Sequence, residues 1–488
     1  MSRFEETGKT TTDTISSVPS NDIEKTFDTK DVVGISTDAV YEVDRAAERR
    51  LVWRMDIRIL PASMFIYVLN FLARANIGNA KILNENTGNS LDQTLQITDH
   101  QYTVALMVFL IAYMIFQIPS NYLLKRCYPS RWIAFLMFGW GLMTLCLGFV
   151  KNFSQLTAVR FLLGAFEAGL FPGLIYFLTF WYKPRERAVR IALIAACATL
   201  GGGFSGVIAF CVGLLNKSRG LEGWRLLFII EGVPSCFVAF FVWFFFPDYP
   251  ETARWLSPKD KELAVNRIKG EVSLGHAKIT WDESRRTLLD WRLYLHYLAF
   301  VAISIPFSSF QLFAPTIVAG LGFENLRAQL FTVPPYAIAF VSTVITSRLA
   351  DKYEMWSWGS FVPMALSGIS FLVLGLLPTM DFKARYGMLC MAASWAYACN
   401  PSLLSWLTAN LKSTTATSLS VALNVTLGTL GQIIGVYIYK TDEAPTFPTG
   451  HFTNAAALLF AAALVLWLRV VYIRRNRVLP LGEGLWRL

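Results

Sequence analysis

Arg160 and Glu167 lie inside one apolar stretch, between Leu156 and Phe180, that is long enough to cross a bilayer. An ionisable residue within a membrane helix is costly and by default marks a substrate or ion pathway. The two residues are seven apart, which is about two turns, so they share one face of a helix. A guanidinium can bind an anion and a carboxyl group can carry a proton. This pair therefore predicts a membrane carrier.

The composition points to a membrane protein before any motif is considered. Of the 488 residues 54% are hydrophobic, and only 16% are charged, against about 25% in soluble domains. The mean hydropathy is +0.43. The net charge of +10 lies mostly in tails and alternate loops, where the positive-inside rule places it. Because no basic face interleaved with aromatic residues accompanies this charge, we do not expect nucleic acid as a partner.

Apolar stretches of about 20 residues, the length that spans a bilayer core, recur twelve times along the chain. We therefore predict an all-α membrane protein with twelve transmembrane helices in two six-helix halves. The predicted spans are 58–79, 102–124, 132–150, 156–180, 188–214, 225–246, 293–320, 329–349, 358–378, 385–407, 415–438 and 453–473.

The same pattern divides the chain into five parts. Residues 1–57 are predicted to form a cytosolic disordered tail and a short amphipathic helix, and 474–488 form a second cytosolic tail. The two six-helix halves are 58–246 and 293–473. The polar, basic segment 247–292 between them is predicted to be a cytosolic linker with one or two surface helices. Lysine and arginine gather in the loops after even-numbered spans, which places both termini in the cytosol.

Several segments then carry a family resemblance. They include NFLARANIGNAK (Asn70–Lys81), RFLLGAFEAGLFPG (Arg160–Gly173), GWRLLFIIEG (Gly223–Gly232) and the loop SRLADKY (Ser347–Tyr353). Together they resemble the major facilitator superfamily, in particular its fungal anion:cation symporter branch, which includes the allantoate and nicotinate permeases. The resemblance implies the major facilitator fold, alternating access and proton-driven import across the cell membrane.

The resemblance also implies roles for single residues. Arg74 matches an arginine that binds the substrate carboxylate, Tyr113 matches a substrate-facing tyrosine, and Arg160 with Glu167 matches a pair that couples anion binding to a proton. The chemistry suits these roles, because a guanidinium offers paired donors to a carboxylate and stays charged when desolvated. The alternative is that Arg160 and Glu167 only pair with each other and hold the bundle together.

Polar residues within the apolar spans of the second half complete the candidate site. Gln311, Asn400 and Asn424 are candidate substrate contacts, although such residues also hydrogen-bond one helix to another. Trp395 and Tyr397 could form the wall of a site for an aromatic ring.

One departure from the family pattern concerns proton coupling. Family members usually carry an aspartate directly before the arginine of the first helix, and this chain has Ala73 there. Glu167 is then the main proton carrier, or coupling is lost and facilitated diffusion or exchange remains. Glu231, a second acid within an apolar span, is expected to be structural.

We therefore expect a secondary active transporter of a small carboxylate-bearing organic anion, such as a vitamin-, allantoate- or aromatic-acid-like compound. The alternatives are an exporter of an acidic secondary metabolite, a facilitative carrier, and a membrane sensor. An enzyme is not expected, because no cluster of histidines, cysteines or carboxylates shares one depth, and no cofactor or metal site is indicated. The expected partners are the organic anion, the proton and the lipid bilayer, with the protein a monomer in the cell membrane.

Overall fold

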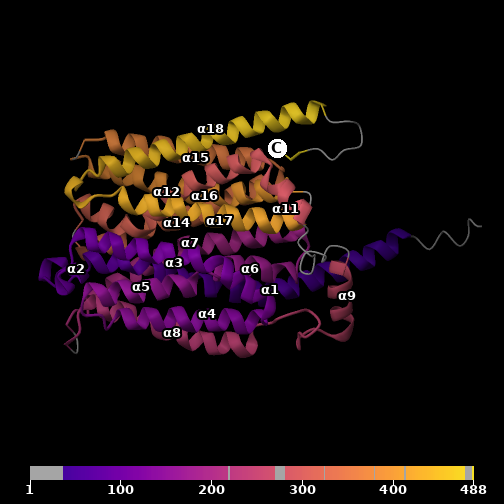
Figure 1. Ribbon diagram of the computed structural model, residues 1–488, viewed down its shortest axis with the longest axis horizontal. Coiled ribbons are helices and arrows are strands. Elements are labelled where there is room, and N and C mark those ends of the chain that lie inside the picture. The colour runs from indigo at the N-terminus through magenta and orange to yellow at the C-terminus, as the bar shows by residue number, and fades with distance from the viewer. Residues whose placement is uncertain are drawn as a thin grey trace, which may run out of the picture. The chain divides into compact units, whose positions relative to one another are not determined.

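The computed structural model describes residues 37–217, 220–269, 281–323, 325–378, 380–411, 414–478 and 486–487. Within these ranges the chain forms helices and no strand (Figure 1). Trp53 and the residues after it form one unit, and the residues before it form another.

The helices of the bundle form because a bilayer core offers no hydrogen bonds, so backbone N–H and C=O groups must pair within each segment. In chain order they are α1 (Thr37–Ile82), α3 (Asp99–Arg126), α4 (Pro129–Leu147), α5 (Phe153–Glu167), α6 (Leu170–Thr179), α7 (Pro184–Gly213), α8 (Gly223–Phe245), α12 (Trp291–Gly320), α14 (Val333–Lys352), α15 (Trp356–Leu376), α16 (Phe382–Ala409), α17 (Thr414–Tyr437) and α18 (Pro448–Val478). The remaining described helices are η1 (Glu85–Thr87), α2 (Leu91–Leu95), α9 (Pro258–Lys269), α11 (Trp281–Leu288), α13 (Asn325–Phe331) and η3 (Thr441–Glu443).

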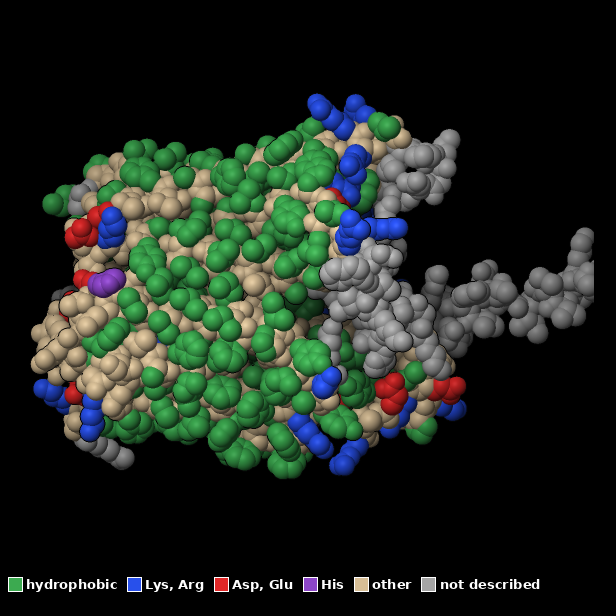
Figure 2. Space-filling model, viewed as in Figure 1, with side chains coloured by type: hydrophobic (Ala, Val, Ile, Leu, Met, Phe, Trp, Pro, Cys, Tyr) green, Lys and Arg blue, Asp and Glu red, His purple; other side chains and the backbone are tan. Residues whose placement is uncertain are grey.

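The predicted fold class is confirmed. Eleven spans among the described helices are long and apolar enough to cross a bilayer. The remaining predicted span, 385–407, lies in α16, which has 28 residues but whose apolar run is interrupted by serine, tyrosine and asparagine. Side chains exposed along the bundle are largely hydrophobic, and the charged ones on the visible face gather at its two ends (Figure 2).

The fourth span departs from the continuous helix predicted for 156–180. Helix α5 ends at Glu167 and α6 begins at Leu170. Gly169, at this break, lies so close to α3 that a Cβ atom there would overlap the Ser120 hydroxyl. The break therefore fits a close approach of two helices, and it comes directly after the candidate proton carrier.

The two ends of the bundle are distinct. The end that carries η1, α2 and η3 is called the loop end, and the end that carries α9 and α11 is called the linker end (Figure 1). At the linker end, Ser257 accepts a hydrogen bond from the Asp260 backbone N–H at 3.2 Å, so α9 begins at Pro258 with a serine cap. Arg54 of α1 forms an ion pair with Asp260 at 2.9 Å. The predicted linker therefore contains helices, and both α9 and α11 contact the bundle.

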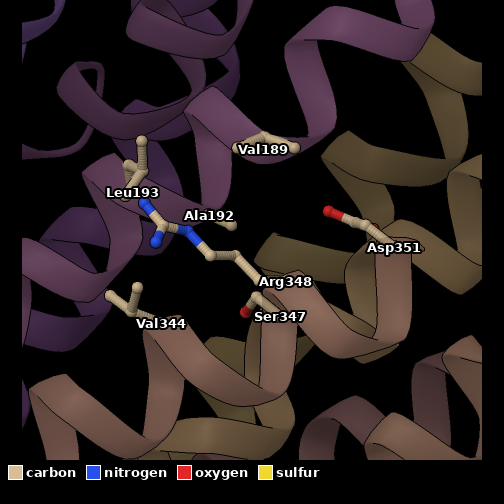
Figure 3. Close-up of a pocket in the computed structure, with 7 residues that line it drawn as sticks. All are labelled: Val189, Ala192, Leu193, Val344, Ser347, Arg348 and Asp351. Atoms are coloured by element: carbon tan, nitrogen blue, oxygen red, sulfur yellow. The ribbon is translucent and has the colours of Figure 1, made fainter. Parts of the chain in front are cut away.

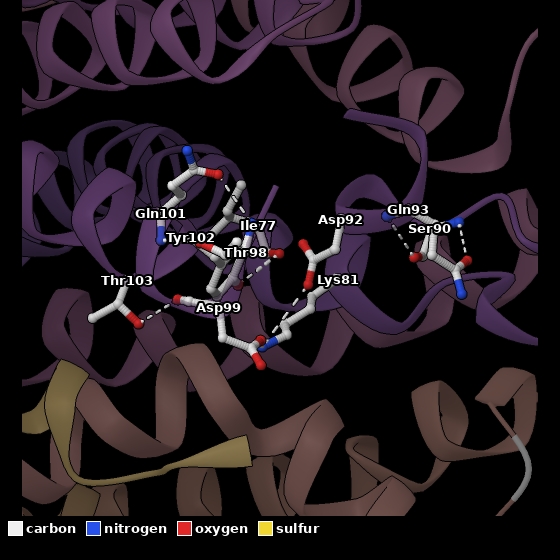
Figure 4. A network of polar contacts seen from close by, with 10 residues as sticks. All are labelled: Ile77, Lys81, Ser90, Asp92, Gln93, Thr98, Asp99, Gln101, Tyr102 and Thr103. Carbon is white, nitrogen blue, oxygen red and sulfur yellow. Dashed lines mark hydrogen bonds and ion pairs between the residues drawn. The ribbon is translucent and has the colours of Figure 1, made fainter. Parts of the chain in front are cut away.

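An ionic network fastens the loop end of α1 to the segment that follows it (Figure 4). Lys81 lies 2.8 Å from an oxygen of Asp99 and 3.9 Å from one of Asp92, and its ammonium group lies 4.7 Å from the centre of the Tyr102 ring. Burial raises the pKa of Asp92 to about 7, although Lys81 opposes this shift. Asp92 is thus a partly buried acid whose cationic partner among the described residues, Lys81, is 3.9 Å away.

Candidate functional site

An ion pair between α1 and α5 lies at the centre of the first half. Arg74 Nε is 3.1 Å from Glu167 Oε2. Glu167 is 1% exposed and the Arg74 side chain 11%. Glu167 is the last residue of α5, next to the break in the span.

Two aromatic rings of α3 cover the guanidinium groups. The Arg74 guanidinium carbon lies 4.6 Å from the centre of the Tyr113 ring and 5.1 Å from that of Phe109, and the Arg160 guanidinium carbon lies 4.6 Å from the Phe109 ring. Gly164 permits this arrangement, because a Cβ atom there would overlap the backbone of Phe109. The five residues Arg74, Phe109, Tyr113, Arg160 and Glu167 are called the ionic cluster below.

Arg160 is the least satisfied member of the ionic cluster. It is 1% exposed, and it makes no hydrogen bond with any residue that the structure describes. Its Nε and Nη1 atoms are buried, as is the Oε1 atom of Glu167, which also lacks a partner there. Pairing between Arg160 and Glu167 is not seen, because the ion pair of Glu167 is made with Arg74. Since buried polar groups are nearly always paired, these atoms are free to bind a ligand or water: the two nitrogens as donors and the carboxylate oxygen as an acceptor.

Aromatic side chains of the second half lie across from α1. The ring of Phe71 in α1 contacts that of Phe307 in α12, with centroids 6.2 Å apart. Phe307 lies 5.0 Å from Tyr397 of α16, and Tyr397 lies 5.8 Å from Tyr336 of α14. Phe310 completes this group at 5.2 Å from Tyr336. The residues Phe307, Phe310, Tyr336 and Tyr397 are called the aromatic cluster. Of these, Tyr397 has a buried hydroxyl without a hydrogen-bond partner among the described residues.

The amide candidates of the second half do not gather at one depth. Gln311 and Asn424 are both buried, and each has one side-chain atom without a partner in the described parts of the chain. Helices α12 and α17 run in the same direction, because Gly431 packs against Val301 and, four residues on, Gly435 packs against Ile305. This register separates Gln311 from Asn424 by about 25 Å along the helix axis. One small ligand therefore cannot contact both.

Asn400 lies on α16, the helix that also contributes Tyr397 to the aromatic cluster. It is half-buried and directly precedes Pro401, which interrupts the hydrogen bonding of the helix. Trp395 of the same helix is also half-buried, and its indole N–H has no partner among the described residues.

Sequence reasoning missed Phe109, Asn70 and Gln117. Phe109 lies four residues before Tyr113 on the same face of α3, and this spacing could have revealed it. Asn70 of α1 is buried with an unpartnered side-chain nitrogen, judged over the described residues. Gln117 accepts a hydrogen bond from Thr426 of α17 at 3.4 Å and so joins the two halves. That contact could not be found from spacing along one helix.

Glu231 lies apart from the ionic cluster. Its Oε2 atom accepts a hydrogen bond from the Asn76 amide, and Asn76 in turn accepts one from Asn79 at 3.2 Å. Asn79 also donates to Ser205 of α7 at 3.1 Å. Glu231 therefore belongs to a chain of polar contacts that ties α8, α1 and α7 together.

A cleft of about 240 Å³ lies elsewhere, between α7 and α14 at the linker end. The side chain of Arg348 points across it toward Leu193, and Asp351 stands at its other side (Figure 3). Asp351 accepts a hydrogen bond from the Trp356 indole at 2.7 Å. The cleft includes part of the SRLADKY segment and none of the predicted site residues. It is lined by Val189, Ala192, Leu193, Val344, Ser347, Arg348 and Asp351.

Comparisons with known proteins agree with this architecture. Residues 63–436 match the sequence profile of the Major Facilitator Superfamily. The chain belongs to this superfamily. It is 51% identical to the MFS transporter prlL of Fungal sp. (strain NRRL 50135), over 89% of this chain and 88% of the relative. It is also 30% identical to the MFS-type transporter cnsO of Penicillium expansum, over 86% and 82%.

Solved structures show the same fold. A bacterial homologue of the human lysosomal transporter Spinster, inward-facing and unoccupied, aligns with a TM-score of 0.63 at 18% identity, over 85% of this chain and 97% of that one. The xylose transporter XylE from E. coli, in a partially occluded inward-open conformation, aligns with a TM-score of 0.61 at 13% identity, over 84% and 97%. The protein is therefore a multi-pass membrane transporter of this superfamily, and not an enzyme.

Proposed function

We propose that this transporter carries a small carboxylate-bearing organic anion, with Arg74 and Arg160 as the anion site and Glu167 as the proton carrier. The observation that carries the proposal is the buried guanidinium of Arg160, which has no hydrogen-bond partner among the described residues. An uncompensated buried charge is strongly unfavourable. A carboxylate would supply both the opposite charge and paired acceptors.

Charge counting supports coupling to one proton. With all three groups ionised, the ionic cluster carries two arginine charges and one glutamate charge, a net charge of +1. Adding one anion and one proton leaves this net charge unchanged. The proton on Glu167 also weakens its 3.1 Å pair with Arg74, so that both guanidinium groups can turn toward the anion. A carboxyl group in a dry, low-dielectric site holds a proton more readily than one in water, which favours this role.

The second half is proposed to supply the remaining wall of the site. The aromatic cluster meets α1 at Phe71, one turn from Arg74, so the proposed anion would place its apolar ring against these aromatic side chains and its carboxylate against the guanidinium groups. Gln311 and Asn400 are the proposed amide contacts. Asn424, about 25 Å from Gln311 along the helix axis, is proposed to meet the anion at a different stage, near the linker end.

The proposed setting is the cell membrane, with both termini in the cytosol and the protein acting as a monomer. The basic residues at the linker end support this orientation. The segments 58–246 and 293–473 are proposed to be the two halves that rock against each other, joined by the linker 247–292. The proposed direction is import; an exporter of an acidic metabolite would use the same site with the opposite gradient.

A facilitative carrier or exchanger is the second candidate. It is favoured by Ala73, which is buried where an acid would sit in related permeases, and by Glu167 already having Arg74 as its partner. In such a carrier the pair would stay intact and Arg160 alone would hold the anion.

Uptake into proteoliposomes tests the anion site. Radiolabelled nicotinate, benzoate and allantoate are offered with the outside at pH 5.5 or 7.5. Arg160→Ala is expected to lower uptake of any transported acid by about 100-fold or more, because it removes a desolvated charge contact. The control is Arg385→Lys, which changes an equally buried arginine whose guanidinium donates to the carbonyl of Thr446 at 3.1 Å. Normal uptake by Arg160→Ala would reject the proposed site.

Glu167→Gln tests coupling in the same vesicles. The variant is expected to lose acid-driven accumulation and to keep exchange of labelled for unlabelled substrate, since the amide cannot release a proton. If substrate addition still moves protons into these vesicles, Glu167 is not the carrier. If wild-type uptake is equal at both pH values, the facilitative carrier is the correct function.

A further inference from the structure

Trp486 and Arg487 lie against the linker ends of helices of the second half, and asparagine side chains bind their backbone. Asn476 of α18 accepts the Trp486 N–H and donates to the Trp486 carbonyl, both at 2.8 Å. Asn410, directly after α16, accepts the Arg487 N–H at 2.8 Å and donates to the Arg487 carbonyl at 3.1 Å. Each amide thus pairs with both peptide groups of a residue, as a neighbouring strand would.

The side chain of Trp486 is held as firmly as its backbone. Its indole stacks on the ring of Tyr472, with centroids 5.6 Å apart and planes 4° apart, and the Arg292 guanidinium lies 4.1 Å from the indole. Trp406 of α16 donates its indole N–H to the Arg487 carbonyl at 3.0 Å. The residues Arg292, Trp406, Asn410, Tyr472 and Asn476 are called the tail site. It joins α12, α16 and α18 through one short segment.

Helix α16 is built to bend just before the tail site. Pro401 has no N–H to donate, so the helix lacks a hydrogen bond at this position and can bend there. Trp406 and Asn410 lie beyond the proline, whereas Tyr397 of the aromatic cluster lies before it. Helix α16 also contacts α7 of the first half. Movement of its last two turns away from α12 and α18 would break the contacts with Trp486 and Arg487.

We propose that Trp486 and Arg487 form a releasable latch that holds the last two turns of α16 against α12 and α18, and so slows their movement about Pro401. The occupant of the tail site is this chain's own segment. Release does not require unfolding of a helix, because Trp486 and Arg487 lie outside any helix. Trp486 is also only half-buried, and the ion pair of Arg487 with Glu354 is exposed. The proposal requires neither a particular substrate nor proton coupling.

Hydrogen–deuterium exchange of the full-length transporter in lipid nanodiscs tests the latch without any substrate. Trp486→Ala removes the stack, and Asn476→Ala removes the backbone contact from the opposite side. Each is expected to speed amide exchange in residues 402–411 by about tenfold, with the other helices unchanged. The double variant is expected to exchange no faster than the faster of the two single variants, because both changes release the same segment.

Two conservative variants serve as controls. Trp486→Phe retains a ring that can stack on Tyr472, and Arg487→Ala retains the backbone contacts while losing an exposed ion pair. Both are expected to stay within about twofold of the wild-type exchange rate. The latch is rejected if Trp486→Ala and Asn476→Ala leave exchange in 402–411 within about twofold of wild type. It is equally rejected if exchange rises to the same extent in every helix, since that shows general loosening.

Discussion

The first half of the chain buries two arginines and a glutamate around α3, whereas the second half presents rings and amides from α12, α14 and α16. Among the described residues, the helices of the second half bury Arg292 and Arg385; Arg385 donates from Nη2 to the carbonyl of Thr446 at 3.1 Å, while its Nε and Nη1 atoms have no partner there. Arg160 is buried to the same degree and has no hydrogen-bond partner among the described residues. The comparison separates a cation that backbone carbonyls satisfy in part from one that makes no hydrogen bond with the described residues.

The same contrast assigns different tasks to the two halves. Ionic groups discriminate by charge, and they are costly to bury, so their presence needs a functional reason. Aromatic rings add apolar contact area at little conformational cost and tolerate variation in ligand shape. A substrate held between them would be selected for its carboxylate by the first half and for its ring by the second. The predictions below test this division.

The largest expected effect comes from breaking the ion pair of the first half. Glu167→Ala leaves Arg74 buried and unpaired, so the free energy of unfolding should fall by about 3–5 kcal/mol. Thermal unfolding in detergent measures this loss. Replacing both residues by methionine should recover most of it, because a matched apolar pair needs no compensation. Equal unfolding temperatures for wild type and Glu167→Ala would show that Glu167 bears little charge in this state.

The contact between the halves gives the second prediction. Gly78 of α1 lies against the Leu312 carbonyl of α12, and a Cβ atom there would overlap it. Gly78→Ala should push α1 from α12 and reduce transport at least about tenfold, since packed interfaces tolerate little added volume. Gly387 of α16 is the control: a Cβ there meets nothing within 4 Å, so alanine should be neutral or stabilising by up to about 1 kcal/mol. Full transport by Gly78→Ala would mean that this approach is not needed.

A smaller effect is expected within the aromatic cluster. The Tyr397 hydroxyl is buried and unpartnered among the described residues, so Tyr397→Phe should keep the stability within about 1 kcal/mol of wild type or raise it slightly. The affinity for an aromatic acid should then fall only modestly if the ring is the main contact. A large loss of affinity at unchanged stability would show that the second half also recognises the anion through hydrogen bonds.

The sequence predicted the fold well because long apolar spans leave the chain little choice of structure. It also placed Arg160 and Glu167 on one helix face, where both are buried. It could not show that Glu167 pairs with Arg74, because the two residues are 93 positions apart and meet only when α1 packs on α5. Nor could it separate Gln311 from Asn424 in depth, since that depends on the register between α12 and α17. The break after Glu167 was likewise missed. Nothing in the sequence distinguishes Gly169 from other glycines of apolar helices, and its close approach to Ser120 is known only from the structure.

The smallest prediction concerns a second ionic group of the first half, at the loop end. Burial raises the pKa of Asp92 from 3.8 to about 7, against the opposing effect of Lys81. Between about pH 4 and pH 7 the unfolded chain loses this proton while the folded protein keeps it, so Asp92 lowers the stability as the pH rises and by a constant amount above pH 7. Asp92→Asn cannot ionise, so its melting temperature should match wild type near pH 4 and exceed it by about 1–3 °C at pH 8. Asp442→Asn, in the exposed η3 of the second half, controls for the loss of a negative charge at the same end of the bundle. If both variants shift the melting temperature equally at every pH, overall charge explains the effect, and the partial burial of Asp92 does not.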